Sequence, residues 1–405
     1  MKDYDAIIIG AGIAGSCVAY NLIRDGYKGK VLVIDRDVPA GEKSSTALSA
    51  GGFRNLWTTE PNMKLSTFSI KEYEKLQKEE KMNIGFDKAG YLFLKNKKQW
   101  KEAKKIAKTQ KKNGVNLDIL TLKEVSKLIP DLNLKKVDKE IKEFFGIEDL
   151  AGGIIGHDCG FIDGYLLSTS ILGKAKQEGI SLKVNAEVTE IIKKDNTIEG
   201  IKTKQGETIL SPVIINAAGP YAAKIGAMIG VEIPVVPINR QLFVATSPYK
   251  GTKFPMIVLD NGAYMRSELE DLLFGRANKD EPVAKEVNGQ FLMHSDKNYF
   301  MEHIYPYFLA RLPALEKGMS LKSKWGGLYE VNTEDHNAII GQHPDIKGFY
   351  MCCGFSGHGI MEGFAAGKCI SDLIIKGDYV TLPEVKQLRY ERFKEGQLIK
   401  ELEVI

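Results

Sequence analysis

The sequence predicts an α/β protein in which a parallel-sheet domain is assembled from separated segments and joined to an α+β domain with a mixed or antiparallel sheet. Three observations predict this. The first 35 residues contain a strand, a glycine-rich turn, a helix and a second strand. A second glycine-rich turn follows residue 353, and the stretches between the two turns hold lysine-rich helices and alternating strands. A chain of 405 residues is also too long for one compact core, so two domains are expected.

The first 35 residues predict a βαβ unit. Residues 6–9 form a short apolar run, expected to be a strand buried on both faces, and residues 10–15 follow it as Gly-Ala-Gly-Ile-Ala-Gly. Apolar residues at helical spacing over 16–24 predict a helix closed by Gly26, and residues 30–34 predict a second buried strand ending at Asp35. A plain strand, turn and helix is the alternative.

The glycine spacing favours dinucleotide binding over that alternative. Gly10 permits a tight turn, Gly12 lets the backbone approach a pyrophosphate, and Gly15 lets helix and strand pack closely. The helix start supplies N–H groups and a positive dipole end. Asp35 can accept hydrogen bonds from a ribose. Dinucleotide binding therefore explains the three glycines and Asp35 together.

The next segment, residues 43–54, is rich in small and hydroxyl side chains. Ser45, Thr46 and the backbone around Gly51 are expected to line a bound cofactor, and Arg54 brings a fixed positive charge to the same loop. A flexible linker with a surface arginine is the alternative.

Composition limits the class of protein. Hydrophobic content of 43%, charged content of 27% and a net charge of +4 are ordinary for a globular protein and give little reason to expect nucleic acid or membrane partners. The five cysteines form no CxxC pair and no metal-ligand spacing, which favours a reducing compartment. The first strand starts near Met1 and no apolar run is long enough for a bilayer, so we expect a soluble, cytoplasmic protein without a transmembrane segment.

The middle of the chain alternates between helices and strands. Helices are expected at 62–80, 97–113 and 122–129, the last capped by Thr121 and Glu124, and at 163–176 and 299–311, where Pro313 ends the helix. Strands are expected at 90–94, 181–184, 188–192, 198–203, 213–216, 237–248, 256–265 and 272–276. The small residues at 217–220 are expected to let the backbone pass close to the cofactor, although a tight strand-to-helix turn explains them equally well. The later strands, with Arg240, Tyr264 and Arg266, are expected to roof a pocket.

The last section repeats the pattern of the first. Residues 349–353 predict a strand, residues 354–359 read Gly-Phe-Ser-Gly-His-Gly, and a helix follows to residue 376. A second helix dipole aimed at the same ligand suits a flavin, because its positive end stabilises the negative charge that develops on the ring upon reduction. His336 and His358 are candidate acid/base groups, although structural roles are the commoner alternative. Cys352 and Cys353 are expected in the core.

Taken together, these motifs resemble the D-amino acid oxidase-like family of FAD-dependent oxidoreductases, over nearly the whole chain. Within it the sequence is most similar to the branch of sarcosine, dimethylglycine and proline dehydrogenases and the mitochondrial FAD-dependent oxidoreductase-domain protein, through residues 325–329 and 354–359. The resemblance implies a Rossmann-like FAD-binding domain from segments 1–88, 148–222 and 326–405, and a substrate or cap domain from 89–147 and 223–325.

The resemblance also implies a reaction: oxidation of a C–N bond beside a carboxylate by hydride transfer to flavin N5. Glycine and D-amino acid oxidases carry a carboxylate-binding arginine where this chain has Tyr329, which argues against free primary D-amino acids. Monomeric sarcosine oxidases share an arginine at the position of Arg54 but have a lysine at Met361. We therefore expect Arg54 to bind the substrate carboxylate, with Tyr264, Tyr329, Arg266 and His358 as further catalytic or contact residues.

The expected cofactor is FAD, bound without a covalent bond, because Leu48 and Gly327 occupy the positions at which relatives attach flavin. The residues expected to bind it are Gly10, Gly12, Ile13, Ala14, Gly15, Asp35, Arg36, Ser44, Ser45, Thr46, Ala50, Gly51, Gly52, Val188, Ala217, Ala218, Gly219, Gly327, Gly354, Ser356, Gly357, His358, Gly359 and Ile360. No metal is expected.

Electrons are expected to pass to a separate acceptor, a flavoprotein carrier or quinone. Leu273 stands where a sarcosine oxidase lysine activates oxygen, although Arg276 nearby could compensate. Two alternatives to amine oxidation remain open: oxidation of a 2-hydroxy acid or glycerol phosphate, and a low-turnover flavoprotein that serves as an assembly factor.

Overall fold

The computed structural model describes residues 2–249, 251–278 and 281–401. Its first large element is a six-stranded sheet in the order β20 (Ile339–Gln342), β21 (Phe349–Cys353), β12 (Ile214–Asn216), β1 (Ala6–Ile9), β2 (Val31–Ile34) and β8 (Ser181–Lys183). All neighbours are parallel except β20, which runs antiparallel to β21. The sheet therefore joins residues from both ends of the chain.

Both faces of this sheet are covered, which explains why strands β1 and β2 are apolar at every position. On one face lie α1 (Ile13–Arg24), α11 (Gly359–Lys376), α2 (Glu60–Lys78) and α6 (Gly164–Gln177). On the other face lie α7 (Ala222–Ala227) and a three-stranded sheet of β9 (Val188–Lys194), β10 (Thr197–Thr203) and β11 (Thr208–Leu210). Ile8 packs into the first layer and Ile7 into the second, because successive side chains of a strand alternate.

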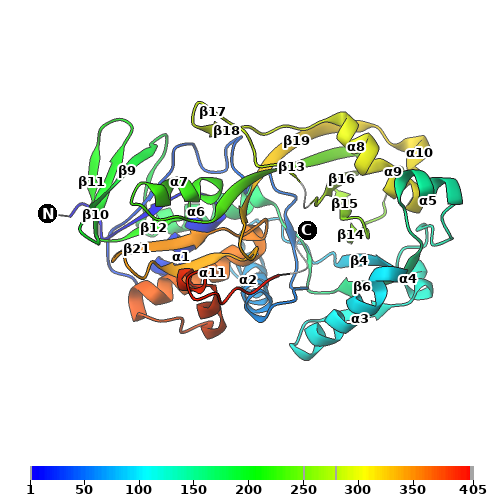
Figure 1. Cartoon of the computed structure of the whole chain (residues 1–405), viewed down its shortest axis with the longest axis horizontal. Coiled ribbons are helices and arrows are strands. Elements are labelled where there is room, and N and C mark those ends of the chain that lie inside the picture. The colour runs from blue at the N-terminus through cyan, green and yellow to red at the C-terminus, as the bar shows by residue number, and fades with distance from the viewer. Residues whose placement is uncertain (1, 250, 279–280, 402–405) are drawn as a thin grey trace.

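The second large element is an eight-stranded mixed sheet. Its order is β19 (Leu321–Asn332), β13 (Val235–Thr246), β16 (Asp271–Arg276), β15 (Ala263–Glu268), β14 (Met256–Val258), β4 (Tyr91–Asn96), β6 (Leu150–Gly156) and β5 (Leu117–Leu120). Only the β14–β4 pair is parallel. In Figure 1 this sheet lies on the right, with the helices around it α3 (Lys97–Lys112), α4 (Leu122–Leu128), α5 (Lys139–Phe145), α8 (Lys297–His303), α9 (Tyr305–Arg311) and α10 (Leu315–Gly318).

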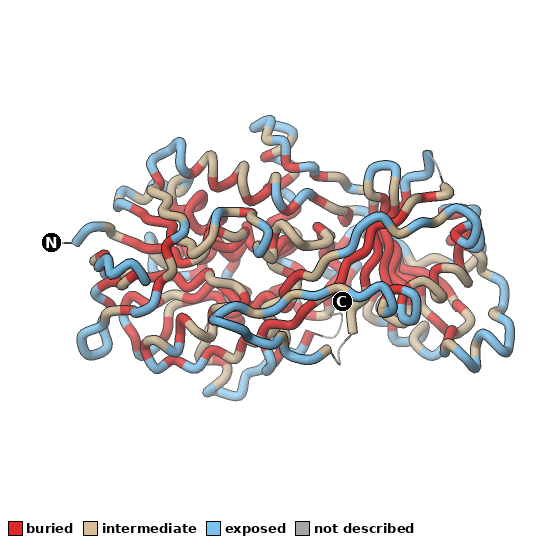
Figure 2. The backbone as a smooth tube through the Cα atoms, turned by 90° about the horizontal axis from the view of Figure 1, so that it is seen from above, coloured by how far each residue is buried: buried red, intermediate tan, exposed pale blue. Residues whose placement is uncertain are grey.

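The two large sheets meet along β13 and β19, two strands of twelve residues that pair along nearly their whole length. Figure 2 shows that buried backbone continues through both halves of the molecule. The short pairs β3 (Gly52–Phe53) with β7 (Gly160–Phe161) and β17 (Glu286–Val287) with β18 (Gln290–Phe291), and the 3-10 turns Gly219–Tyr221, Pro383–Leu388 and Tyr390–Arg392, complete the described elements.

Most predicted elements are confirmed, including the capping box of Thr121 and Glu124 at the start of α4. The helix predicted at 299–311 is wrong as a single element. It is two short helices, α8 and α9, separated at Ile304, whose φ of −124° is not helical; Pro306 opens the second helix. Strand β6 was missed by the sequence analysis, because its Leu-Ala-Gly-Gly-Ile-Ile-Gly sequence lacks the usual strand composition.

The chain alternates between the two sheets: β1 and β2, then β4 to β6, then β8 and β12, then β13 to β19, and finally β20 and β21. The five-segment division into domains stays a prediction. Strand β19 spans the boundary at 325, and β6 belongs to the eight-stranded sheet although it lies within a segment assigned to the cofactor domain.

All five cysteines are buried and free, as expected for core residues. Within the described residues, no group of three or more His, Cys, Asp or Glu side chains is arranged to hold a metal ion. The helices of the described part of the chain include none with the length and apolar character needed to cross a membrane.

Candidate functional site

The glycine-rich turn at the end of β1 opens into a cavity of about 240 Å³. Segments distant in sequence line it: the ends of β1, β2 and β12, the loop of residues 36–46, residues 186–188, α7 and β19. Such a position, beyond the carboxyl ends of parallel strands, is where open α/β sheets bind ligands.

The three glycines take the positions expected of them. Gly10 has φ of +113°, and a Cβ there would lie 2.2 Å from the Ala217 carbonyl oxygen. A Cβ on Gly15 would lie 1.9 Å from the Gly10 carbonyl oxygen, so helix α1 packs on the turn only because this residue is glycine. A Cβ on Gly12 would meet only the Thr46 hydroxyl, at 3.3 Å, which leaves this backbone open to the cavity.

Two side chains fix the turn. Thr46 accepts a hydrogen bond from the Ile13 N–H at 3.1 Å, and Asp35 accepts one from the Ala11 N–H at 2.7 Å. Asp35 also accepts the Asp37 N–H at 2.9 Å. Burial raises the pKa of Asp35, and the two N–H donors partly oppose this. The loop from the second strand is thereby held at the mouth of the cavity.

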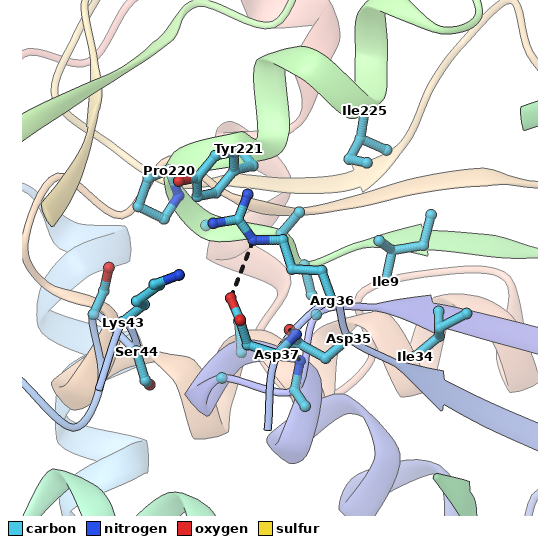
Figure 3. Close-up of a pocket in the computed structure, with 18 of the residues that line it drawn as sticks. Ile9, Ile34, Asp35, Arg36, Asp37, Lys43, Ser44, Pro220, Tyr221 and Ile225 are labelled. Carbon is cyan, nitrogen blue, oxygen red and sulfur yellow. Dashed lines mark hydrogen bonds and ion pairs between the residues drawn. The ribbon is translucent and has the colours of Figure 1, made fainter. Parts of the chain in front are cut away.

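On the opposite side of the cavity, Arg36 lies over the ring of Tyr221, 3.7 Å from the ring centroid, and its Nε is 3.3 Å from the Asp37 carboxylate. Figure 3 shows Arg36 pointing toward Tyr221, with Lys43 and Ser44 across the cavity. Cations of Arg36, Lys43 and Lys224 therefore line a cavity that also contains a helix start. This arrangement suits a ligand carrying phosphates.

A second, smaller pocket of about 50 Å³ adjoins the first through shared segments. Loop residues 43–46 line the first cavity and 49–52 the second; on β19, Leu328 and Glu330 line the first and Tyr329 the second. The second pocket is lined by Ser49, Ala50, Gly51, Gly52, Arg54, Tyr91, Met256, Tyr264, Tyr329, Gly357, His358, Ile360 and Met361.

Arg54 is the cation of this second pocket. Its side chain is buried, donates a hydrogen bond to the Leu56 carbonyl oxygen at 2.7 Å, and stacks over the Trp57 ring at 3.6 Å. Trp57 is also fully buried and is fixed by the Ser66 hydroxyl, which accepts its indole N–H. The guanidinium is therefore held in place before any ligand arrives.

Three tyrosines and a histidine complete the pocket. Burial raises the pKa of Tyr91, Tyr264 and Tyr329, so their hydroxyls stay protonated and can donate hydrogen bonds. His358 lies 4.2 Å from the Trp57 ring, and its Nε2 has no hydrogen-bond partner among the described residues. Burial, with Arg54 next, holds the pKa of His358 well below its usual value, so the ring is neutral.

Glu330 is a site residue that the sequence analysis missed. Its carboxylate accepts the Gly354 N–H at 2.7 Å and lines the larger cavity. Burial raises the pKa of Glu330 to about 8, against the effect of the Gly354 and Phe355 N–H donors. A carboxyl group that is largely neutral at pH 7 thus lies between the two glycine-rich turns.

The larger cavity contains Gly10, Gly12, Ile13, Ala14, Asp35, Arg36, Ser44, Ser45, Thr46, Val188, Ala217, Ala218 and Gly219 of the expected cofactor residues. Ala50, Gly51, Gly52, Gly357, His358 and Ile360 line the smaller pocket instead. Gly15, Gly327, Gly354, Ser356 and Gly359 line neither. Of these, Gly354 donates to Glu330, and Ser356 accepts the Asn332 N–H at 3.0 Å.

The second glycine-rich turn converges on the first. Gly359 begins α11, and a Cβ there would lie 3.7 Å from the Ile13 side chain at the start of α1. The starts of the two helices are therefore neighbours, although 346 residues separate them. The expectation of two helix starts near one ligand agrees with this geometry.

Three expected pocket residues lie elsewhere. Arg266 reaches the pocket only through the Ala50 carbonyl oxygen, to which its Nε donates at 2.9 Å. Arg240 lies behind Tyr329, 5.2 Å from its ring centroid. His336 stands in a turn with φ of +59° and lines neither pocket.

The sequence analysis also missed Tyr91, Met256, Asp37, Lys43, Tyr221 and Lys224, all of which line one of the pockets. Tyr91 and Met256 lie on strands whose positions were predicted but whose pocket-facing side was not.

The fold, the glycine turns and the two adjoining pockets define a nucleotide-binding oxidoreductase. The sequence matches the family described as DAO: FAD dependent oxidoreductase over residues 5–373, and the chain belongs to this family. Its cofactor is FAD, as in the family and its structural neighbours.

The chain is 26% identical to FAD-dependent oxidoreductase domain-containing protein 1 of Xenopus laevis, a match that covers 99% of this chain and 85% of that protein. It is 27% identical to mitochondrial dimethylglycine dehydrogenase of Homo sapiens, covering 92% of this chain and 43% of the longer protein. Among solved structures, L-proline dehydrogenase from P. horikoshii matches with a TM-score of 0.84 and 27% identity, covering 98% of this chain and 100% of that one. Amino-acid dehydrogenases are therefore among its relatives.

Proposed function

We propose that this flavoprotein is an FAD-dependent dehydrogenase that oxidises the C–N bond of a small N-substituted amino acid of the sarcosine, dimethylglycine or proline type. Bound FAD supplies the hydride acceptor, flavin N5. The relatives named above that act on dimethylglycine and L-proline support this class of substrate. The single observation that carries the proposal is the buried Arg54 in a small pocket beside the cofactor cavity.

Arg54 suits a substrate carboxylate. A guanidinium offers paired N–H donors to a carboxylate, and such charge-assisted bonds strengthen where water is excluded. The contacts with Trp57 and Leu56 fix the side chain, so the substrate loses little free energy in ordering its partner. A pocket of about 50 Å³ admits only a small molecule, which favours N-methyl amino acids and proline over bulkier substrates.

The remaining side chains of the pocket can orient the substrate and hold a proton. Tyr264 and Tyr329 are protonated donors for the second carboxylate oxygen or the amine lone pair. Neutral His358 lines the pocket, and its Nε2, which has no partner among the described residues, can accept a hydrogen bond from the N–H of a secondary amine substrate. Met256, Ile360 and Met361 are apolar and exclude water from the reacting carbon.

For FAD we propose the larger cavity and its lining residues. The pyrophosphate is assigned to the start of α1 around Gly12 and Ile13, and a ribose to Asp35, whose two oxygens retain acceptor capacity after the bonds from Ala11 and Asp37. The shared loop and the shared strand β19 then connect the cofactor to the Arg54 pocket.

The test is anaerobic bleaching of the purified yellow protein. Sarcosine, dimethylglycine and L-proline are mixed with it one at a time, beside L-lactate and glycerol 3-phosphate, and flavin absorbance is followed. Bleaching by an amine alone supports the proposal. Bleaching by a hydroxy acid or glycerol phosphate selects that chemistry instead, and no bleaching by any compound selects a low-turnover assembly role.

We further propose that the protein works in a reducing compartment such as the cytoplasm and passes its electrons to a separate flavoprotein carrier or quinone. Five buried cysteines without a disulfide support the first point. The described residues contain no cysteine cluster for an iron–sulfur centre, which supports the second.

A further inference from the structure

Helix α3 carries an unusual concentration of positive charge. It contains eight lysines and one glutamate in sixteen residues. Ala103, Ala107 and Gln110 form its buried face, and all eight lysines are exposed. In Figure 1 the helix lies at the lower right edge of the molecule, on the outside of the eight-stranded sheet.

Five of these lysines form one row. Lys97, Lys101, Lys104, Lys108 and Lys112 follow each other at spacings of three or four residues, which places them along one face of the helix. We call them the outer lysine row. Within the part of the chain that the structure describes, no carboxylate lies within ion-pair distance of any of the five, whereas Lys98, Lys105 and Lys111 have such partners. Like charges at this spacing repel each other and cost the helix stability, although the Nζ of Lys104 lies 5.4 Å from the centroid of the Trp100 ring.

The inner face of α3 touches the candidate active site. Gln110 is buried and donates a hydrogen bond to the Trp57 carbonyl oxygen at 3.0 Å. The Trp57 ring in turn stacks on Arg54 and lies 4.2 Å from His358, both of which line the smaller pocket. A molecule docked on α3 is therefore separated from the pocket by one helix and one aromatic side chain.

We propose that the outer lysine row is the docking face for an acidic redox protein that takes electrons from the reduced flavin through the α3 and Trp57 region. This rests on the proposed function only in that electrons leave FAD for a separate acceptor. Two electrons pass to two equivalents of a one-electron acceptor, and the proton held at N5 of the reduced cofactor goes to solvent. Electron transfer falls steeply with distance, so an exit close to the pocket is favoured, and the Gln110–Trp57 hydrogen bond brings α3 close to it.

A protein partner fits this surface better than a membrane does. Peripheral membrane helices usually insert large apolar side chains beside their cations. Among the described residues, none of the large apolar side chains that are exposed belongs to α3. Cations on a helix that exposes no large apolar side chain in the described residues instead steer an acidic partner and speed its association.

The test uses holoenzyme reduced by light with EDTA, so that no substrate is needed and failure of the proposed amine oxidation does not affect the result. Under anaerobic conditions the reduced protein is mixed by stopped flow with ferricyanide, a trianion, and separately with tris(phenanthroline)cobalt(III), a cation. The rate constants are measured over a range of KCl concentrations. The direction in which each rate constant changes with KCl concentration reports the sign of the charge on the surface where the electrons leave.

The test variant combines Lys101→Glu, Lys104→Glu and Lys108→Glu. Its matched control combines Lys176→Glu, Lys193→Glu and Lys194→Glu on α6 and β9, which are exposed and have no ion-pair partner in the described residues. Both change the net charge equally. A triple Lys→Gln variant at 101, 104 and 108 serves as the test variant if the charge reversal lowers FAD content.

With wild type and the control, we expect ferricyanide to react more slowly as salt rises and the cobalt complex to react faster. In the test variant the ferricyanide rate constant falls about tenfold at low salt and its salt slope reverses. Equal slopes in all three proteins overturn the proposal, because electrons then leave elsewhere. Sedimentation with phosphatidylserine-containing vesicles that is lost only in the test variant also overturns it, since the row would then bind lipid.

Discussion

Gly327 of β19 faces Leu48: a Cβ on Gly327 would lie 3.3 Å from the Cβ of Leu48. Trp325 also contacts Leu48: its indole N–H donates a hydrogen bond to the Leu48 carbonyl oxygen at 2.9 Å. These two positions are those at which covalent flavoproteins of similar sequence attach their cofactor. Here they meet as a leucine and a glycine, which offer no nucleophile.

We therefore expect FAD to be released on denaturation. Precipitation of the protein with trichloroacetic acid should leave the yellow colour in the supernatant, with a free-FAD spectrum and an intact FAD mass. The pellet should show no flavin fluorescence in a denaturing gel. Colour retained in the pellet contradicts the assignment, and peptide mass mapping would then locate the bond.

Replacing Arg54 should weaken the binding and turnover of carboxylate substrates far more than it weakens the binding of FAD. Loss of a charge-assisted bond in a dry pocket costs about 2 to 4 kcal/mol, so Arg54→Ala should lower kcat/KM for a carboxylate substrate by ~30-fold or more. Flavin content should change little, because Arg54 lines the smaller pocket alone.

Because Arg54 is packed against Trp57, the alanine variant also leaves a void. Arg54→Lys keeps the charge and most of the volume, and Arg54→Met keeps the volume without the charge. We expect lysine to retain more activity than methionine at similar melting temperatures. Folded apoprotein from either variant would place Arg54 in the cofactor site instead.

The substrate-reduced enzyme should react slowly with oxygen. Leu273 is buried in the same cluster as Tyr91 and Tyr264, so the position that holds a lysine in monomeric sarcosine oxidases is apolar and faces the pocket side of the sheet. Arg276 does not compensate, since its Nε donates to the Asn261 carbonyl oxygen at 3.4 Å and it lines neither pocket. Stopped-flow mixing with air-saturated buffer measures this. Reoxidation as fast as substrate reduction, with stoichiometric peroxide, would identify an oxidase.

Glu330 should make stability depend on pH. Its pKa rises from 4.5 to about 8 on folding, so between these values the folded protein holds a proton that the unfolded chain has released. The free energy of unfolding then falls as pH rises through this window, by at most about 1.4 kcal/mol per pH unit, and the loss is complete above pH 8.

Urea unfolding at several pH values, with excess FAD, tests this for Glu330→Gln against wild type. The glutamine side chain cannot ionise, so the free energy of unfolding of the variant should rise relative to that of wild type from pH 5 to pH 8. Glu334→Gln, an exposed change two residues beyond β19, serves as control and should follow wild type. If the free energy of unfolding depends on pH in the same way for all three proteins, Glu330 is ionised in the folded state.

Sequence analysis predicted the parts of this protein whose structure is determined by a short local sequence pattern. The βαβ unit was readable because its strands are apolar at every position and its glycines serve backbone geometry, as at Gly10 and Gly15. The second turn at Gly354 was readable for the same reason. FAD and the family follow from these motifs and are confirmed.

What sequence could not give was the pairing of distant strands. Tyr91 lies in a predicted strand, but its place in the pocket depends on β4 pairing with β14, which brings Met256 beside it. Glu330 follows Tyr329 directly, and strand alternation sends the two side chains to different pockets. Which pocket each one reaches is set by the β13–β19 register, and no local signal in the sequence carries that information.

The strand order of the six-stranded sheet has a consequence for biosynthesis. Strands β1 and β2 leave the ribosome before the other strands of this sheet, but β1 pairs with β12 and β12 with β21, whose register joins Ile214 to Phe349. The second glycine turn follows β21, so the nascent chain can place it beside the first turn only after residue 359 has been made. A ribosome that stalls before β21 therefore releases a chain in which β12 lacks this partner and leaves an apolar sheet edge exposed, a substrate for chaperones or proteases.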